Sequence, residues 1–144
     1  MRPIYETNKD RQRQSEAISH LAQATNTEAV ETDPLVSWDY EMVRNNVVVA
    51  MVEVKCRNCK SSTYETYIIS EAKVVILWET AIKRDIASVL LVCWKDQEIG
   101  WLRIDTTNPQ TWAVQHGGRV DRNDPLDIER VVHFDISSFR FIKK

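Results

Sequence analysis

The sequence predicts an α/β domain in which a central mixed sheet is flanked by helices. Three observations support this fold class. Residues 6–25 and 71–84 carry apolar side chains at helical spacing, and residues 47–55 form a Val-rich run that suits a strand covered on both faces. The predicted order is a helix, three strands, a helix and a strand, followed by a β-rich segment.

The first predicted helix spans residues 6–25, and Asn26 is a suitable stop for it. Its apolar arc consists of Ala17, Ile18, Leu21, Ala22 and Ala24. Residues 29–36 contain Pro34 and are interpreted as a loop or a short edge strand. A hairpin then follows, with strands at residues 37–43 and 47–55 and a turn at residues 44–46.

The second half of the chain begins with a short aromatic and β-branched strand at residues 64–69. Ser70 is a good N-cap for a helix at residues 71–84. The side chains expected to face inward from this helix are Ala72, Val75, Ile76 and Ile82. Further strands are predicted at residues 87–94, 99–104, 111–115 and 130–136.

Composition indicates one ordinary globular domain over residues 1–144, with 43% hydrophobic and 28% charged residues. The formal net charge is −2, so a nucleic-acid partner would bind a local basic patch. Three cysteines, an odd number, favour reduced thiols and a cytoplasmic setting over a disulfide framework. Because the sequence shows no apolar membrane-length segment and no Gly-rich phosphate loop, we expect neither a membrane partner nor a nucleotide cofactor.

Two opposite charges close the Val-rich run. Glu53 is the only charged residue among residues 47–54, and Lys55 follows Val54 directly. Side chains alternate along a strand, so Glu53 and Lys55 point to the same face. A buried strand does not end in this way unless the charges pair or take part in chemistry.

The register of the hairpin decides whether Asp39 shares that face with Glu53, because directly opposite residues of an antiparallel pair lie on one face. A plain two-residue loop would place Asp39 opposite Val52 and turn its carboxylate away. We expect a three-residue loop with an Asn in the left-handed region, or an equivalent bulge. That loop places Asp39 opposite Met51 and diagonal to Glu53.

Two carboxylates beside a lysine suit a magnesium site, because Mg²⁺ prefers hard oxygen ligands. Asp39 and Glu53 would hold the ion, for which Mn²⁺ can substitute, and the carbonyl of Val54 could add a ligand. Such an ion polarises a phosphodiester and lowers the pKa of a bound water. Lys55 would stabilise the developing charge or orient the attacking water. The candidate catalytic residues are therefore Asp39, Glu53 and Lys55.

This pattern, Asp39 followed by Glu53-Val54-Lys55 on the next strand, resembles the PD-(D/E)xK nuclease superfamily. The resemblance implies an α-β-β-β-α-β restriction-endonuclease-like core over about residues 6–105, with a β-rich tail at about residues 106–144 outside it. Residues 52–57 are most similar to small Holliday-junction-resolvase-like and phage-type nucleases. The proline that gives the signature its name is absent, since Trp38 precedes Asp39.

The resemblance also implies a further glutamate ligand from the first helix. Glu16 has the spacing of the family but falls opposite the apolar arc, whereas Glu6 falls at its edge, so both stay open. Candidate contacts to the substrate backbone are Arg57, Lys60 and Lys73.

The function implied is a metal-dependent endonuclease that hydrolyses DNA phosphodiester bonds in phage or bacterial DNA processing. The low net charge of the chain limits non-specific affinity for duplex DNA, which fits a structure-selective enzyme. The alternative is a non-catalytic nucleic-acid-binding or assembly module on a degenerate nuclease fold. Resolvase-like relatives act as dimers, because two symmetric cuts need two sites, so a homodimer stays open. Cys56 and Cys59 have the C-x2-C spacing of one half of a zinc site, but Cys93 is the only other cysteine, which favours structural thiols.

Overall fold

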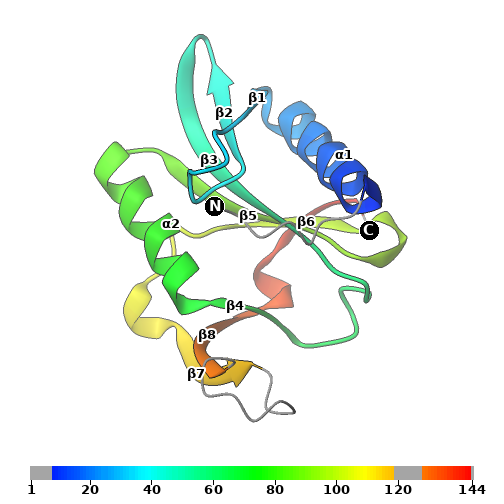
Figure 1. Ribbon diagram of the computed structural model, residues 1–144, viewed down its shortest axis with the longest axis vertical. Helices are drawn as coiled ribbons and strands as arrows, with labels where there is room; N and C mark the ends of the chain where they lie inside the picture. The colour runs from blue at the N-terminus through cyan, green and yellow to red at the C-terminus, as the bar shows by residue number, and fades with distance from the viewer. Residues whose placement is uncertain (1–7, 119–127, 144) are drawn as a thin grey trace.

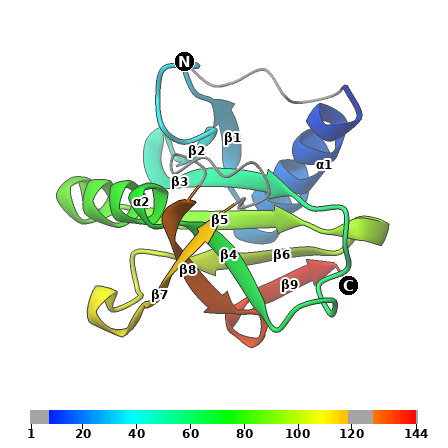
Figure 2. The ribbon, with the colours of Figure 1, turned by 60° about the horizontal axis from the view of Figure 1, so that its bottom comes forward.

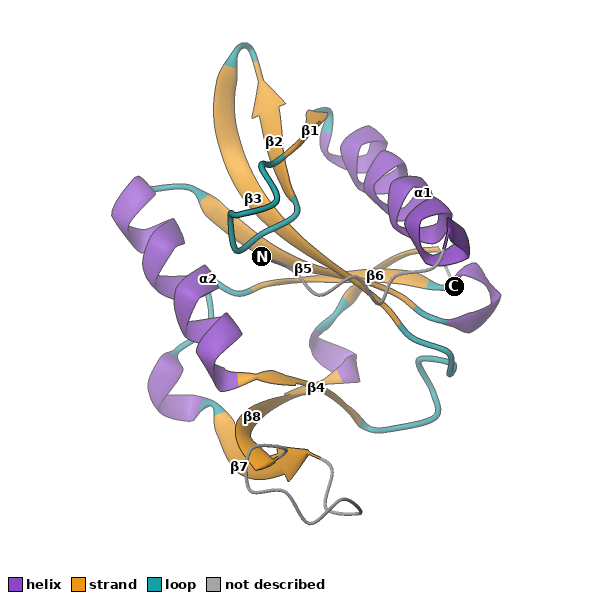
Figure 3. Ribbon diagram, viewed as in Figure 1, coloured by secondary structure: helices purple, strands orange, loops and turns teal. Residues whose placement is uncertain are grey.

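A computed structural model describes residues 8–118 and 128–143 and contains a six-stranded mixed sheet. The strands are ordered β1-β2-β3-β5-β6-β9, and only β3 and β5 run parallel (Figures 1 and 3). Their bounds are β1 (Glu28–Glu31), β2 (Tyr40–Arg44), β3 (Val47–Cys56), β5 (Ala87–Cys93), β6 (Ile99–Arg103) and β9 (Arg140–Lys143). The predicted mixed sheet is confirmed, with the Val-rich run at its centre.

A second, three-stranded sheet has the order β4-β8-β7 and is antiparallel throughout (Figure 2). Its bounds are β4 (Thr66–Ser70), β7 (Ala113–Gly118) and β8 (Ile128–Asp135). Short 3-10 turns are found at Lys95–Gln97, Pro109–Thr111 and Ile136–Ser138. The residues after 105 therefore contribute strands to both sheets: β9 pairs with β6, and β8 pairs with β4. The strand β9 has no counterpart among the sequence predictions.

Helix α1 (Asn8–Thr25) covers one face of the large sheet (Figure 1). Its buried residues Ala17, Ile18 and Leu21 pack against alternate residues of β3 and β5. Asn26 ends the helix in the left-handed region at φ 53°, as predicted. The predicted arc is wrong at Ala24, which is exposed.

Helix α2 (Glu71–Arg84) covers the opposite face and has the predicted bounds. Ser70 occupies the N-cap position but makes no side-chain capping hydrogen bond. The inward face was predicted wrongly: Ala72, Ile76 and Ile82 are exposed and Val75 is half-buried. The residues that pack on the sheet are instead Val74, Leu77 and Ala81, which keep i, i+3 and i+7 spacing. Apolar residues occur on several sides of this helix, so periodicity alone did not select the buried face.

The hairpin between β2 and β3 combines a tight turn with a bulge. Asn45 and Asn46 both have positive φ, at 52° and 64°, which gives a two-residue loop that matches the twist of the strands. The predicted three-residue loop is therefore wrong, and the equivalent bulge is found. The register shifts between Met42 and Val43, so that Val49 is the extra residue on β3. Beyond the shift Tyr40 pairs with Val52, and Asp39 does not face Met51.

The two faces of the sheet carry separate hydrophobic cores. One lies under α1, and the other is shared by α2, the large sheet and the second sheet. Glu53 and Lys55 alternate with Val52 and Val54, whose side chains belong to the core under α1, so the two charged residues face the α2 side. No described helix is long and apolar enough to cross a membrane.

Candidate active site

Asp39 lies just before β2, where the bulged hairpin holds it against the middle of β3. Its backbone N–H donates to the carbonyl of Val52 at 2.9 Å. Its carboxylate Oδ2 accepts a hydrogen bond from the backbone N–H of Val54 at 2.8 Å. The side chain is only 7% exposed. Both contacts fix the carboxylate beside the β3 segment that carries Glu53. Sequence analysis predicted this proximity, but from a strand register in which Asp39 faces Met51.

Glu53 is 5% exposed, in the buried middle of β3. The pKa of its carboxyl is raised from 4.5 to about 7. Burial is the largest cause of this rise, and the negative charge of Asp39 is the second. The ammonium groups of Lys73 and Lys55 act in the opposite direction. The structure therefore brings two carboxylates together in a poorly solvated site, where they repel each other when both are ionised.

Lys73 extends from the first turn of α2 to this pair. Its Nζ lies 3.1 Å from Glu53 Oε2 and donates to the backbone carbonyl of Ser37 at 2.5 Å. The contact with Glu53 is an ion pair without hydrogen-bond alignment, since Oε2 has no hydrogen-bond partner among the described residues. Sequence analysis predicted that Lys73 contacts the substrate backbone, and the structure places its ammonium group against Glu53.

Lys55 lies two residues beyond Glu53 on the same face of β3 and is half-buried. Within the described parts of the chain its ammonium group makes no hydrogen bond or ion pair, while its charge lowers the pKa of Glu53. An ammonium group that is close to the carboxylates but not held by one is available to a ligand.

The donor set fits a divalent cation. Two buried carboxylates face one another, and one oxygen of Glu53 lacks a hydrogen bond within the described residues. Hard carboxylate oxygen atoms are the ligands that Mg²⁺ and Mn²⁺ prefer. The backbone carbonyl of Val54, the remaining predicted ligand, belongs to the residue whose N–H holds Asp39.

A comparison with protein families matches residues 1–142 to the family described as "phage putative PDDEXK endonuclease". The chain belongs to this family. The match confirms the resemblance inferred from Asp39 and Glu53-Val54-Lys55, and it includes the β-rich segment that the sequence left outside the resemblance. No curated protein sequence matches the chain.

Among solved structures, the fold is similar to that of Hjc, a Holliday junction resolvase from the archaeal hyperthermophile Archaeoglobus fulgidus. The TM-score is 0.54 at 12% sequence identity, and the alignment covers 88% of this chain and 89% of Hjc. At this identity the similarity concerns the fold, and it confirms the restriction-endonuclease-like fold class. The PDDEXK assignment therefore rests on the family match, and the resolvase-like architecture rests on the structural match.

The other basic candidates of this PDDEXK family member lie in the loop after β3. The guanidinium of Arg57 lies 4.6 Å from the ring centroid of Tyr67 and donates to the carbonyl of Ile68 at 3.5 Å. Lys60 forms an ion pair with Asp96 at 3.4 Å. Both residues line a cavity of about 750 Å³ beside β4. The two residues lie on the loop that follows Cys56, beyond the end of the strand that carries Glu53 and Lys55.

Among the described residues, the predicted helix ligand Glu16 does not lie at Asp39 and Glu53. Glu16 is exposed on α1, is bonded to Gln12 at 3.4 Å, and lines a different pocket. Glu6 lies outside the described residues. Among residues 8–118 and 128–143 no three His, Cys, Asp or Glu side chains are grouped closely enough to hold an ion, and the three cysteines are free thiols.

Sequence analysis missed Tyr67, which lies on β4 next to this site. Its hydroxyl is buried and has no hydrogen-bond partner within the described residues. Burial raises the pKa of the phenol, and the charge of Glu53 raises it too. The strand at residues 64–69 was predicted, but its pairing with β8 under the large sheet depends on contacts distant in sequence. Local pattern therefore gave no signal for this tyrosine.

Proposed function

We propose that the chain is a single-domain, Mg²⁺-dependent endonuclease that hydrolyses phosphodiester bonds of DNA in phage or bacterial DNA processing in the cytoplasm. One observation carries the proposal. The carboxylates of Asp39 and Glu53 are buried side by side, and the ammonium groups of Lys73 and Lys55 act on Glu53. Family membership supports the reaction class, and Mn²⁺ is expected to replace Mg²⁺.

Asp39, Glu53 and the carbonyl of Val54 would hold the ion, and Glu6, which lies outside the described residues, is a further candidate, whereas Glu16 lines a different pocket. When bound, Mg²⁺ supplies Lewis acidity at the phosphate and a more acidic water. The N–H of Val54 keeps Asp39 oriented, since it occupies Oδ2 with a hydrogen bond. Lys55 stabilises negative charge that develops on the phosphate oxygens or orients the attacking water.

Lys73 has a positioning role in this scheme. Its ammonium lies 3.1 Å from Glu53 and opposes the rise in the pKa of that carboxyl. It therefore favours the ionised form of Glu53, which is the form that binds a cation. Its bond to the carbonyl of Ser37 fixes the segment before Asp39 at the same time. Arg57 and Lys60 are left as candidate contacts to more distant phosphates.

The fold makes branched DNA the first substrate to examine, because Hjc is a Holliday junction resolvase. The net charge of −2 supports selectivity for a DNA structure, since a weak overall field gives little non-specific duplex affinity. Symmetric cutting of a junction needs two active sites, so a homodimer is expected on that substrate. Sedimentation velocity with and without a four-way junction tests this point.

Cleavage assays with Mg²⁺ or Mn²⁺ test the function on supercoiled plasmid, single strands, flaps and four-way junctions. Wild type is compared with Glu53→Ala and Lys55→Ala, and with Glu79→Ala and Lys83→Ala as controls from exposed positions of α2. We expect metal-dependent cutting by wild type and both controls, and at least 100-fold slower cutting by the two site variants. Absence of cutting by wild type, with DNA binding unchanged in all variants, would favour the non-catalytic binding module.

A further inference from the structure

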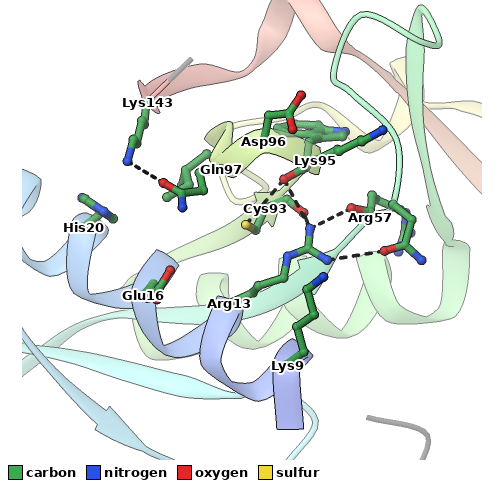
Figure 4. Close-up of a pocket in the computed structure, with 13 residues that line it drawn as sticks. Lys9, Arg13, Glu16, His20, Arg57, Cys93, Lys95, Asp96, Gln97 and Lys143 are labelled. Carbon is green, nitrogen blue, oxygen red and sulfur yellow. Dashed lines mark hydrogen bonds between the residues drawn. The ribbon is translucent and has the colours of Figure 1, made fainter. Parts of the chain in front are cut away.

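A second pocket lies where α1 passes the ends of the parallel strands β3 and β5. Its volume is about 450 Å³, and it is separate from the carboxylate site, since Asp39, Glu53, Lys55 and Lys73 are not among the described residues that line it. Figure 4 shows side chains from α1 facing others from the turn after β5 and from β9. Of its lining residues the proposed function gives a role to Arg57 alone, as a candidate phosphate contact, and it assigns none to the rest of the pocket.

The pocket is positive although the whole chain is negative. Its described lining residues include only two carboxylates, those of Glu16 and Asp96. Asp96 is already paired with Lys60 at 3.4 Å. The lining residues with a permanent positive charge are Lys9, Arg13, Arg57, Lys95 and Lys143, and His20 adds a titratable group. In a chain of net charge −2 this is a concentrated patch of one sign.

Arg13 is the fixed centre of the pocket (Figure 4). Its guanidinium donates to the carbonyls of Arg57 at 2.7 Å, Cys93 at 3.1 Å and Trp94 at 3.2 Å. These bonds join α1 to the ends of both parallel strands without neutralising its charge, because the acceptors are uncharged. Arg13 also forms an ion pair with Asp10 of α1 at 3.6 Å, which offsets part of its charge. The arrangement is therefore preorganised, which reduces the entropy lost when a ligand binds.

The surrounding lysines are more exposed and come from separate elements. Lys9 lies on α1, Lys95 begins the 3-10 turn after β5, and Lys143 ends β9, where its Nζ donates to the side-chain oxygen of Gln97 at 2.9 Å. Cations spread over several elements suit several successive phosphates better than one small anion. Such contacts orient a nucleic acid without reading its sequence.

We propose that this pocket binds the sugar–phosphate backbone of a nucleic-acid strand, outside the carboxylate site. Arg57 follows Lys55 by two residues, about 7 Å along extended chain. The pocket thus begins where the strand that carries Glu53 and Lys55 ends. The binding does not depend on cleavage, so it goes beyond the proposed endonuclease reaction and can be tested without it.

The test measures fluorescence anisotropy of labelled single-stranded, duplex and four-way-junction DNA in EDTA, which prevents metal-dependent cutting. Lys95→Ala and Lys143→Ala each remove one lysine of the pocket. Lys83→Ala removes one exposed lysine from α2 and is the charge-matched control. We expect each pocket variant to bind about 5–8-fold more weakly near 0.1 M salt, and the slope of log K against log salt to fall by about 0.7–0.9. Lys83→Ala should change neither quantity.

Equal binding by the pocket variants and the control would overturn the proposal, as would failure of wild type to bind any of the DNAs. Inorganic phosphate and a mononucleotide serve as competitors. If either binds wild type as tightly as an oligonucleotide does, the pocket is a small-anion site, and the assignment to a nucleic-acid strand is wrong.

Cleavage assays on the same variants separate this inference from the proposed function. Loss of binding in the pocket variants with an inactive wild type would keep the pocket and reject the nuclease. Cleavage by wild type, together with unchanged DNA binding in the pocket variants, would support the nuclease and reject the proposed role of the pocket.

Discussion

Replacement of Glu53 by glutamine is expected to stabilise the metal-free protein at and above neutral pH. Folding raises the pKa of this carboxyl from 4.5 to about 7, chiefly through burial. A carboxyl whose pKa is raised on folding favours the folded state below the unfolded pKa, and this contribution is lost as pH rises through the folded value. At pH 8 the unfolded chain is ionised at no cost, whereas the folded chain must hold a buried negative charge.

Over the whole pH range, this pKa shift lowers the free energy of unfolding by about 3 kcal/mol. About 2–3 kcal/mol of this loss occurs between pH 5 and pH 8. Urea unfolding in EDTA measures the effect. We expect the free energy of unfolding of wild type, relative to Glu53→Gln, to fall by that amount between the two pH values. Glu79→Gln, an exposed carboxylate of α2, should follow wild type at both pH values.

A parallel pH dependence in wild type and Glu53→Gln would refute this reasoning, because it would mean that Glu53 ionises freely in the folded protein. The expected result would show that the fold tolerates an unfavourable charge at this position. A bound divalent cation would offset that charge, which links the instability of the site to its proposed chemistry.

Three further outcomes are expected. Asp39→Asn keeps a hydrogen-bond acceptor for the backbone but removes the charge that raises the pKa of Glu53, so unfolding between pH 5 and pH 8 should depend less on pH than in wild type. Leu77→Ala empties a fully buried position and should lower the free energy of unfolding by about 2–5 kcal/mol, whereas Ile82→Ala, at an exposed position, should cost less than about 1 kcal/mol in the same urea titration. Gly100→Ala places a Cβ 3.1 Å from an indole carbon of Trp94. It should lower the free energy of unfolding by about 1–3 kcal/mol, which a decrease in the melting temperature would show.

Elements with strong local signals could be predicted from the sequence. The Val-rich run gave β3, and Ser70 followed by the charged and apolar pattern gave the bounds of α2. The motif residues were found because Glu53 is a charge in an otherwise apolar run. That signal is local, and it needs no knowledge of the partner strands.

Features set by distant contacts could not be predicted in this way. The bulge that brings Asp39 to Glu53 was predicted only as the alternative to a three-residue loop, because its occurrence depends on how β2 packs against β3. The second sheet and the position of Tyr67 depend on β8, more than sixty residues away along the chain. The ion pair of Lys73 with Glu53 likewise requires the placement of α2 over the sheet.

Direct binding of Mn²⁺ at pH 8, measured by isothermal titration calorimetry, tests the central claim that Asp39 and Glu53 form a cation site. Wild type and Glu79→Gln should bind the ion alike, while Asp39→Asn and Glu53→Gln should each weaken binding by at least tenfold. Binding by these two variants that equals wild type, or no binding by wild type, would contradict the account.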